Sequence, residues 1–293
     1  MHLSVLQEEL LDYLHPQANE NFVDGTVNGG GDALAILQKT KPRGQVLGID
    51  WTPEVVEKLR IKIRGTAEEP RLRLINDNFV HLKKIVQEEN FQNIAGVVLD
   101  LGLSSWHLET LPRGFSFRQK GELDMRYHPG EKLTAKEIIN YWSKEEIERI
   151  LENYGEERFH RRLAEEIIRA RKIRVIEKVP ELVALIEKVI PRKGKIHPAT
   201  KTFQALRIAV NRELENLEKV LPQALDILKP GGKLALITFQ SLEDRIVKQF
   251  FRLVQDQGRG VVLTKKPVTP SFLEKKRNPR SRSAKLRVMQ KLN

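Results

Sequence analysis

Apolar positions along the first hundred residues change from the period of a strand to the period of a helix and back several times. Short runs rich in Val, Leu and Ile predict strands over residues 21–27, 44–50, 71–77 and 94–102. Apolar residues spaced by three and four predict helices between them, over residues 32–39, 53–64 and 79–89. Strands of this composition, alternating with helices, predict an α/β fold with a parallel, doubly wound sheet.

The alternation stops after the fourth predicted strand. Residues 106–205 show no convincing strand pattern, and their spacing predicts helices over 134–155, 156–172 and 179–190. Helical spacing returns over 198–225, and then come a turn at 229–233, a fifth strand at 234–239 and two strands near 260–266 and 286–292 that could close the sheet as a hairpin. We therefore expect a sheet domain formed by residues 1–105 and 206–293, interrupted by a helical domain over 106–205 that recognises the substrate.

Composition narrows the class of protein. Apolar residues make up 40% of the 293 positions and charged residues 31%, which is typical of a soluble globular chain. No apolar run reaches the roughly 18–20 residues of a membrane span. The first residues form an amphipathic pattern without the basic start and cleavage site of a signal peptide, so we expect a cytoplasmic protein without membrane contact.

The chain contains no cysteine. That absence excludes disulfides, thiolate catalysis, cysteine-ligated zinc and iron–sulfur clusters. The seven histidines are scattered and form no pair at the spacing of metal ligands, so we expect no metal.

The formal net charge of +12 indicates a polyanionic partner, and nucleic acid is the foremost candidate. The charge is concentrated near the end of the chain, where residues 265–293 hold ten Lys and Arg against a single acid, Glu274. This segment suggests a binding loop flanked by strands. The alternative is a basic surface that only meets solvent.

The stretch "FVDGTVNGGGDALAILQ" (22–38) places glycines between a predicted strand and a predicted helix. Asp24 lies before the glycines and Asp32 after them, while Asp50 and Asp100 end two further strands. In open α/β sheets ligands bind beyond the carboxyl ends of the strands, and an acid about twenty residues past the glycines can bind the hydroxyls of an adenosine ribose. A glycine turn alone is equally consistent with simple loop geometry.

NAD and S-adenosylmethionine share this ribose pattern. The acids that flank the glycines, Asp24 and Asp32, would repel a pyrophosphate but suit a ligand with an ammonium and a sulfonium group. The pattern therefore favours S-adenosylmethionine as the cofactor. Nicotinamide-dependent hydride transfer remains a competing hypothesis.

The lack of cysteine also restricts what could be methylated, because methylation of cytosine carbon 5 normally requires a thiolate nucleophile. An exocyclic amine or a ribose oxygen needs mainly positioning and hydrogen-bond acceptors. Asp100, Ser104 and Ser105 follow the fourth predicted strand, and we predict them as the catalytic residues that orient the acceptor. The structural alternative is that they satisfy backbone groups of a turn.

Several long motifs resemble those of one family. They are "GLSSWHLE", "RGFSFRQKGELDMR", "YGEERFHRRLAEEI", "HPATKTFQALRIAVNRELENLE", "ITFQSLEDRIVKQFF" and "NPRSRSAKLRV", which together extend over almost the whole chain. They resemble the bacterial 16S ribosomal RNA (cytosine-N4)-methyltransferase family, RsmH/MraW.

The resemblance implies a class I, Rossmann-like methyltransferase sheet with an inserted helical domain. It also implies S-adenosylmethionine-dependent methylation of the N4 amine of one cytidine in the decoding region of 16S ribosomal RNA. The cofactor contacts that it implies are Gly30, Gly31, Asp32, Asp50, Phe79, Asp100 and His107. The chain departs from the family pattern at three positions, where Asp32 replaces His, His107 replaces Gln and Gln240 replaces His.

RNA contacts are expected in three places. "RGFSFR" combines Arg113 and Arg118 with two phenylalanines that could stack on bases or anchor the loop to the core. Arg207 and Asn211 share one helix face and could reach the cleft or hold the inserted domain. The third set is the basic C-terminal segment, with Asn278, Arg280, Arg282, Lys285 and Arg287.

The expected partner is 16S ribosomal RNA within the 30S subunit, with its target cytidine splayed from a single-stranded loop. The sequence is also compatible with a homodimer. An alternative function is that of a ribosome-assembly binding protein without catalytic activity.

Overall fold

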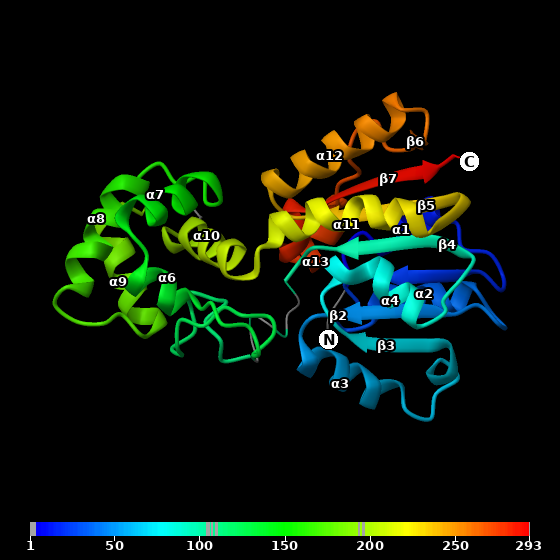
Figure 1. Cartoon of the computed structure of the whole chain (residues 1–293), viewed down its shortest axis with the longest axis horizontal. Helices are drawn as coiled ribbons and strands as arrows, with labels where there is room; N and C mark the ends of the chain where they lie inside the picture. The colour runs from blue at the N-terminus through cyan, green and yellow to red at the C-terminus, as the bar shows by residue number, and fades with distance from the viewer. Residues whose placement is uncertain are drawn as a thin grey trace. The chain divides into compact units, whose positions relative to one another are not determined.

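The computed structural model describes residues 4–103, 106, 108, 111–192, 194 and 197–292. The chain divides into two compact units, which we treat separately. The sheet unit consists of residues 1–104 and 214–293, and the helical unit consists of residues 105–213. Figure 1 shows the strands of the first as arrows and the helices of the second as coiled ribbons.

The sheet unit is built on seven strands in the order β3-β2-β1-β4-β5-β7-β6. Their bounds are β1 Asn21–Asp24, β2 Val46–Asp50, β3 Leu72–Asn76, β4 Ile94–Asp100, β5 Leu228–Thr238, β6 Gly260–Val262 and β7 Lys285–Lys291. The first five strands are parallel, and β7 runs antiparallel between β5 and β6. This topology confirms the predicted α/β fold with a doubly wound sheet, and its order reverses between β1 and β4.

Helices cover both faces of the sheet because successive strand residues point to opposite sides. On β1, Phe22 packs into one apolar cluster and Val23 into the other. The Phe22 cluster includes α1 (Gln7–Leu14), α2 (Gly31–Lys39) and α3 (Pro53–Ile63). The Val23 cluster includes α4 (Leu82–Glu88), α11 (Glu213–Ile227) and α12 (Ser241–Asp256). The remaining short elements are η1 Glu69–Arg71, η2 Phe79–His81, α13 Phe272–Arg277 and η3 Pro279–Ser283.

Strand β5 differs from its prediction. It begins at Leu228, so the segment 229–233 that was predicted as a turn belongs to the strand. Gly231 nevertheless has a left-handed φ of 76°, and the pairing with β4 shifts register between Ile94 and Gly96. The Pro-Gly-Gly signal therefore marks an irregularity inside the strand, because neighbouring β4 continues to pair with it.

The helical unit contains α6 (Ala135–Tyr141), α7 (Lys144–Asn153), α8 (His160–Arg171), α9 (Val179–Val189) and α10 (Ala199–Asn211). The single helix predicted over 134–155 is two helices, α6 and α7. Each begins with a capping box, Thr134 with Glu137 and Ser143 with Glu146. Because the Ser-x-x-Glu pattern is a helix-start signal, this break could have been read from the sequence.

The single helix predicted over 198–225 is also two helices. Arg212 separates α10 from α11 with a left-handed φ of 50°, a conformation that costs a non-glycine residue about 1 kcal/mol or more. Glu213, the next residue, pairs with Arg207 through two hydrogen bonds of 2.8 and 2.9 Å. The pair of Arg207 and Glu213 stabilises the turn at Arg212. Neither arginine nor glutamate is a residue type that predicts a helix end, so this break has no sign in the sequence.

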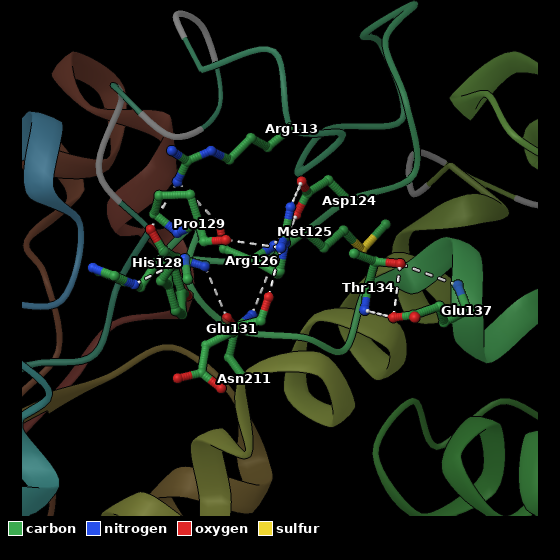
Figure 2. Close-up of polar contacts among 12 residues, drawn as sticks. Arg113, Asp124, Met125, Arg126, His128, Pro129, Glu131, Thr134, Glu137 and Asn211 are labelled. Atoms are coloured by element: carbon green, nitrogen blue, oxygen red, sulfur yellow. Dashed lines mark hydrogen bonds and ion pairs between the residues drawn. The ribbon is translucent and has the colours of Figure 1, made fainter.

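Asn211 and Arg113 hold a long loop of the helical unit through its backbone, as Figure 2 shows. The Asn211 side-chain amide donates to the Met125 carbonyl at 2.7 Å, and its oxygen accepts from the Tyr127 amide at 2.9 Å. Arg113 donates to the Tyr127 carbonyl at 2.8 Å. Met125 lies between these contacts, fully buried and with a left-handed φ of 63°. The contacts therefore stabilise a backbone conformation that a bulky side chain disfavours.

Arg126 forms a second group of stabilising contacts in the same loop. Arg126 donates from two guanidinium nitrogens to the two oxygens of Asp124, at 2.8 and 2.7 Å, and from a third to the carbonyl of Pro129 at 2.9 Å. Figure 2 shows this fork beside the capping box of α6. Bidentate pairs of this kind fix orientation as well as distance.

We expect Asn211→Ala to lower the free energy of unfolding by about 3 kcal/mol, because it leaves buried backbone groups of the loop without partners. Urea unfolding followed by circular dichroism measures the change. Asn153→Ala, at the exposed end of α7, is the matched control and should change stability by less than about 0.5 kcal/mol. Equal effects of the two substitutions would contradict the role of Asn211.

Candidate functional site

Four aspartates gather at the carboxyl edge of the sheet. Asp24 ends β1, Asp50 ends β2, Asp100 ends β4, and Asp32 lies in the first turn of α2, which follows β1. Since β2, β1 and β4 are neighbours, their carboxyl ends meet where the strand order reverses. The four residues are 2%, 7%, 7% and 6% exposed, so all four carboxylates are buried.

Thr26 connects the ends of β1 and β4. Its amide donates to Asp24 Oδ1 at 3.1 Å, and its hydroxyl accepts from the Asp100 amide at 2.6 Å. The Gly102 amide then donates to Asp100 Oδ1 at 3.2 Å. These bonds fix both carboxylates with neutral donors and supply no positive charge.

Asp50 fixes the glycine turn to the end of β2. Asp50 Oδ2 accepts from the amide of Asn28, in the turn, at 3.0 Å, and Oδ1 accepts from the Thr52 amide at 2.9 Å. Asn76, at the end of β3, donates to the Asp50 carbonyl at 2.9 Å. These bonds fix the position of the carboxylate, which also accepts a hydrogen bond from the Thr52 side chain.

Burial without a counter-charge raises the pKa of these acids. Burial raises the pKa of Asp50 to about 6, even though three hydrogen bonds oppose the change. The pKa of Asp100 rises to about 8 through burial first and then through the charges of Asp32 and Glu243. Burial, followed by the charge of Asp32, raises the pKa of Asp24 well above its ordinary value. The site therefore favours a cationic ligand, which would compensate several ionised carboxylates at once.

The glycine turn is explained partly by packing within the protein. Gly30 caps α2 with a left-handed φ of 77°, and a Cβ at this residue would come within 2.5 Å of Leu59. A Cβ at Gly31 would overlap the hydroxyl of Ser4. The left-handed conformation of Gly30 thus requires glycine before any ligand is considered, whereas a side chain at Gly31 would require Ser4 to move.

The N-terminal segment holds Asp32, a contact that the sequence analysis missed. Gln7, the first residue of α1, donates from its side-chain amide to Asp32 Oδ1 at 3.2 Å. Hydrogen bonds from Gln7 and Ser4 lower the pKa of Asp32, while burial, the larger effect, raises it. No local pattern could have revealed this contact, because 25 positions separate the two side chains.

Phe79 lies beside the same edge. It opens η2 after β3, is half-buried against the core, and its Cβ lies 3.6 Å from the position that a Cβ on Gly25 would take. The structure thus brings together Gly30, Gly31, Asp32, Asp50, Phe79 and Asp100 at one sheet edge. Ser104, Ser105 and His107, also predicted for the site, lie outside the described residues.

In the helical unit, the predicted RNA residues take mainly structural contacts. Arg113, Arg207 and Asn211 engage backbone carbonyls or Glu213. Phe115 stacks on Tyr127 and Phe117 stacks on His197, which supports the alternative that these rings anchor the loop. Arg118 is exposed, with its guanidinium carbon 6.0 Å from the ring centre of Phe117.

The RNA contacts predicted in the basic C-terminal segment also include side chains with structural partners. The side chain of Arg287 is 7% exposed and pairs with Asp244 at 2.6 Å, and Lys285 pairs with the same carboxylate at 3.1 Å. Burial in β7 makes Arg287 unavailable to a phosphate, and we therefore remove it from the candidate RNA contacts. Asn278 is the C-cap of α13 and is half-buried, whereas Arg280 and Arg282 in η3 are exposed.

Gln240, one of the departures from the family pattern, caps α12. Its side-chain amide donates to Glu243 at 2.8 Å, and Glu243 also accepts from the Phe239 amide at 2.9 Å. Ser241, the next residue, is the first residue of the helix. The sequence analysis missed Glu243, whose charge acts on Asp100; the helix start directly after β5 was the available signal.

Two features are absent from the described part of the chain. Among residues 4–103, 106, 108, 111–192, 194 and 197–292, no group of three or more His, Cys, Asp or Glu is arranged to hold a metal ion. Over the same residues, no helix combines the length and apolar character of a membrane span.

Comparison with known proteins gives a matching family, related proteins and similar solved structures. The MraW methylase family matches residues 1–292. A protein named Ribosomal RNA small subunit methyltransferase H from Coprothermobacter proteolyticus is 42% identical over 99% of this chain and 96% of its own length. One of the same name from Heliobacterium mobile is 43% identical over 99% of each chain. A solved rRNA methylase from Streptococcus thermophilus is 12% identical, with a TM-score of 0.46 over 97% of this chain and 95% of its own.

The sheet order, the switch point and the acidic edge define a Rossmann-like methyltransferase that uses S-adenosylmethionine. The chain belongs to the MraW methylase family. These findings confirm the family resemblance, the fold class and the cofactor that the sequence predicted.

We expect the affinity for S-adenosylmethionine to rise about tenfold between pH 5 and pH 7. The pKa of Asp50 near 6 leaves much of this carboxyl protonated and uncharged at pH 5, and the ionised form favours a cation. Isothermal titration calorimetry across this range measures the change. Asp50→Asn should remove most of the pH dependence and bind weakly throughout. A wild-type affinity that does not vary with pH would contradict the prediction.

We expect the cofactor-free protein to lose stability as the pH rises from about 4 to about 8. The folded-state pKa of Asp100, about 8, exceeds its unfolded value near 3.9, so the folded state binds more protons in this window and the stabilisation is lost as the carboxyl ionises. Urea midpoints at several pH values test this.

The matched comparison uses two conservative substitutions. Asp100→Asn should flatten the decline, because the group no longer ionises. Asp256→Asn, at an acid whose side chain is 65% exposed, should leave the decline unchanged. An identical decline in wild type and Asp100→Asn would assign the effect to other groups.

Proposed function

We propose that this chain transfers a methyl group from S-adenosylmethionine to the N4 amine of a cytidine in the decoding region of 16S ribosomal RNA. The observation that carries the proposal is the edge of buried carboxylates with raised pKa at the sheet's switch point. Membership of the MraW methylase family and relatives named as small-subunit ribosomal RNA methyltransferases support the RNA substrate. The net charge of +12 agrees with such a polyanion.

The donor site uses the four carboxylates in different ways. Asp50 ends β2 at the position where an acid accepts from the hydroxyls of an adenosine ribose. Asp24 and Asp32 lie beside the glycine turn and supply negative charge for a cationic ligand. When bound, the cofactor supplies a methyl group activated by a sulfonium. A pyrophosphate would meet the same carboxylates as repulsion, which argues against the nicotinamide hypothesis.

Asp100 is the residue that we assign to the acceptor amine. Its Oδ1 is held by the Gly102 amide, and we assign Oδ2 to an N–H of the cytidine amine. Methylation of N4 leaves one proton to be removed from that nitrogen. The ionised form of Asp100 can take it, and with a pKa of about 8 this form becomes more abundant as the pH rises toward 8. Ser104 and Ser105 remain candidates for orienting the amine.

The RNA has to present this cytidine unpaired, because a base-paired amine is already engaged. Exposed cations from both units remain proposed contacts, namely Arg118, Arg280 and Arg282. We further propose that the helical unit recognises RNA around the target and that the physiological substrate is the 30S subunit.

The test is mass spectrometry of nucleosides from unmodified small subunits incubated with S-adenosylmethionine. Wild type should produce N4-methylcytidine. Asp100→Ala should lower the rate by about a hundredfold or more, since it removes the proposed proton acceptor, whereas Asp256→Ala should have no effect. Methylation at a ribose oxygen or another base atom, or full activity of Asp100→Ala, would overturn the proposed chemistry.

A further inference from the structure

A hollow of about 300 Å³ lies at the carboxyl end of β5, within the sheet unit. Its lining comes from the end of β5, the start of α12, the segment before α13, α13 itself, and the segment from η3 to β7. The side chains that matter here are Phe239, Gln240, Ser241, Lys275, Arg282 and Lys285.

The hollow carries surplus positive charge. Lys285 shares the carboxylate of Asp244 with Arg287, so two cations face one acid. Among the described residues, neither the Lys275 ammonium nor the Arg282 guanidinium forms an ion pair. Three cations with one shared acid suit an anionic group.

Nearby acids bind backbone amides. Glu243 accepts from the amides of Phe239 and Gln240, at 2.9 and 3.3 Å. Glu274 accepts from the Leu6 amide at 2.9 Å. Both carboxylates thus have amide partners, and among the described residues neither forms an ion pair with Lys275 or Arg282.

The hollow is next to the end of β4 that carries Asp100. Strands β4 and β5 pair with Asp100 opposite Ile237, two residues before Phe239. A Cβ on Gly102 would lie 2.6 Å from the ring of Phe239 and 3.2 Å from Asp100 Oδ1. Phe239 therefore lines the hollow and also lies beside Gly102, whose amide binds Asp100.

We propose that this hollow binds a backbone phosphate of the RNA strand whose cytidine reaches Asp100, an inference that rests on the proposed function. The phosphates of a splayed nucleotide are only a few bonds from its base. One RNA strand can therefore place its cytidine at Asp100 and a phosphate in the adjacent cationic hollow. Phe272 begins α13 one turn before Lys275 and is 80% exposed, which places an aromatic face where a neighbouring base can stack.

The experiment measures binding of a single-stranded oligoribonucleotide of decoding-region sequence by fluorescence anisotropy at several salt concentrations, without methyl donor. The test variant is Lys275→Ala/Arg282→Ala. The control is Lys84→Ala/Arg252→Ala, which removes the same charge from side chains 70% and 80% exposed on α4 and α12. Thermal unfolding and S-adenosylmethionine affinity verify that both variants keep the fold.

We expect the test variant to bind RNA about tenfold more weakly and the control to bind like wild type. The slope of log affinity against log salt should become shallower by roughly 0.7 for each phosphate that the variant no longer neutralises. Phe272→Ala should weaken binding about fivefold or more with an unchanged slope, because stacking involves no counterion release.

Equal affinity and slope in the test variant and the control would overturn the hollow as a phosphate site. The proposal would also be overturned if the hollow bound free cytidine monophosphate or an acidic peptide selectively while Lys275→Ala/Arg282→Ala left RNA binding unchanged. Methyl transfer to small subunits, measured in parallel, separates the two proposals. If the test variant binds RNA more weakly but wild type transfers no methyl group, the phosphate site is supported and the proposed reaction is refuted. If wild type transfers the methyl group but the variant binds RNA as well as wild type, the reaction is supported and the phosphate site is refuted.

Discussion

The burial of several carboxylates without a cation is the constraint on which the site depends. Asp24, Asp50 and Asp100 end neighbouring strands, so the sheet that buries its apolar residues also buries these acids. Backbone amides and the Thr26 hydroxyl fix their positions but add no charge. The cofactor-free protein therefore keeps an electrostatic penalty that a cationic ligand relieves, and this difference is a source of affinity.

Asp244 shows what the same chain does with an acid that serves the fold. It lies in the first turn of α12, and hydrogen bonds and charges from Arg287 and Lys285 lower its pKa despite the opposing effect of burial. Asp100 has no such partner among the described residues, and its pKa moves in the opposite direction. The contrast between Asp100, at the end of β4, and Asp244, in the first turn of α12, separates a ligand site from a structural ion pair.

The sequence was sufficient where a short-range period or a strand end carried the information. The strands, their order of appearance and the acids that end them were predicted because burial imposes the period and the carboxyl ends of parallel strands share one edge. The break at Arg212 was not predictable, since a left-handed arginine has no local signal and depends on the pair between Arg207 and Glu213. Contacts between distant segments, such as Gln7 with Asp32, were missed for the same reason.

Basic composition alone could not separate two kinds of arginine. Arg287 and Arg282 lie five positions apart in one basic segment, yet strand β7 buries the first and η3 exposes the second. The distinction matters for function because exposed charges are screened by salt while buried ones are screened much less. Under the proposed assignments, the RNA step and the cofactor step use charges of opposite sign in different environments, on adjacent strand ends. Ionic strength and pH therefore act on different steps of one reaction.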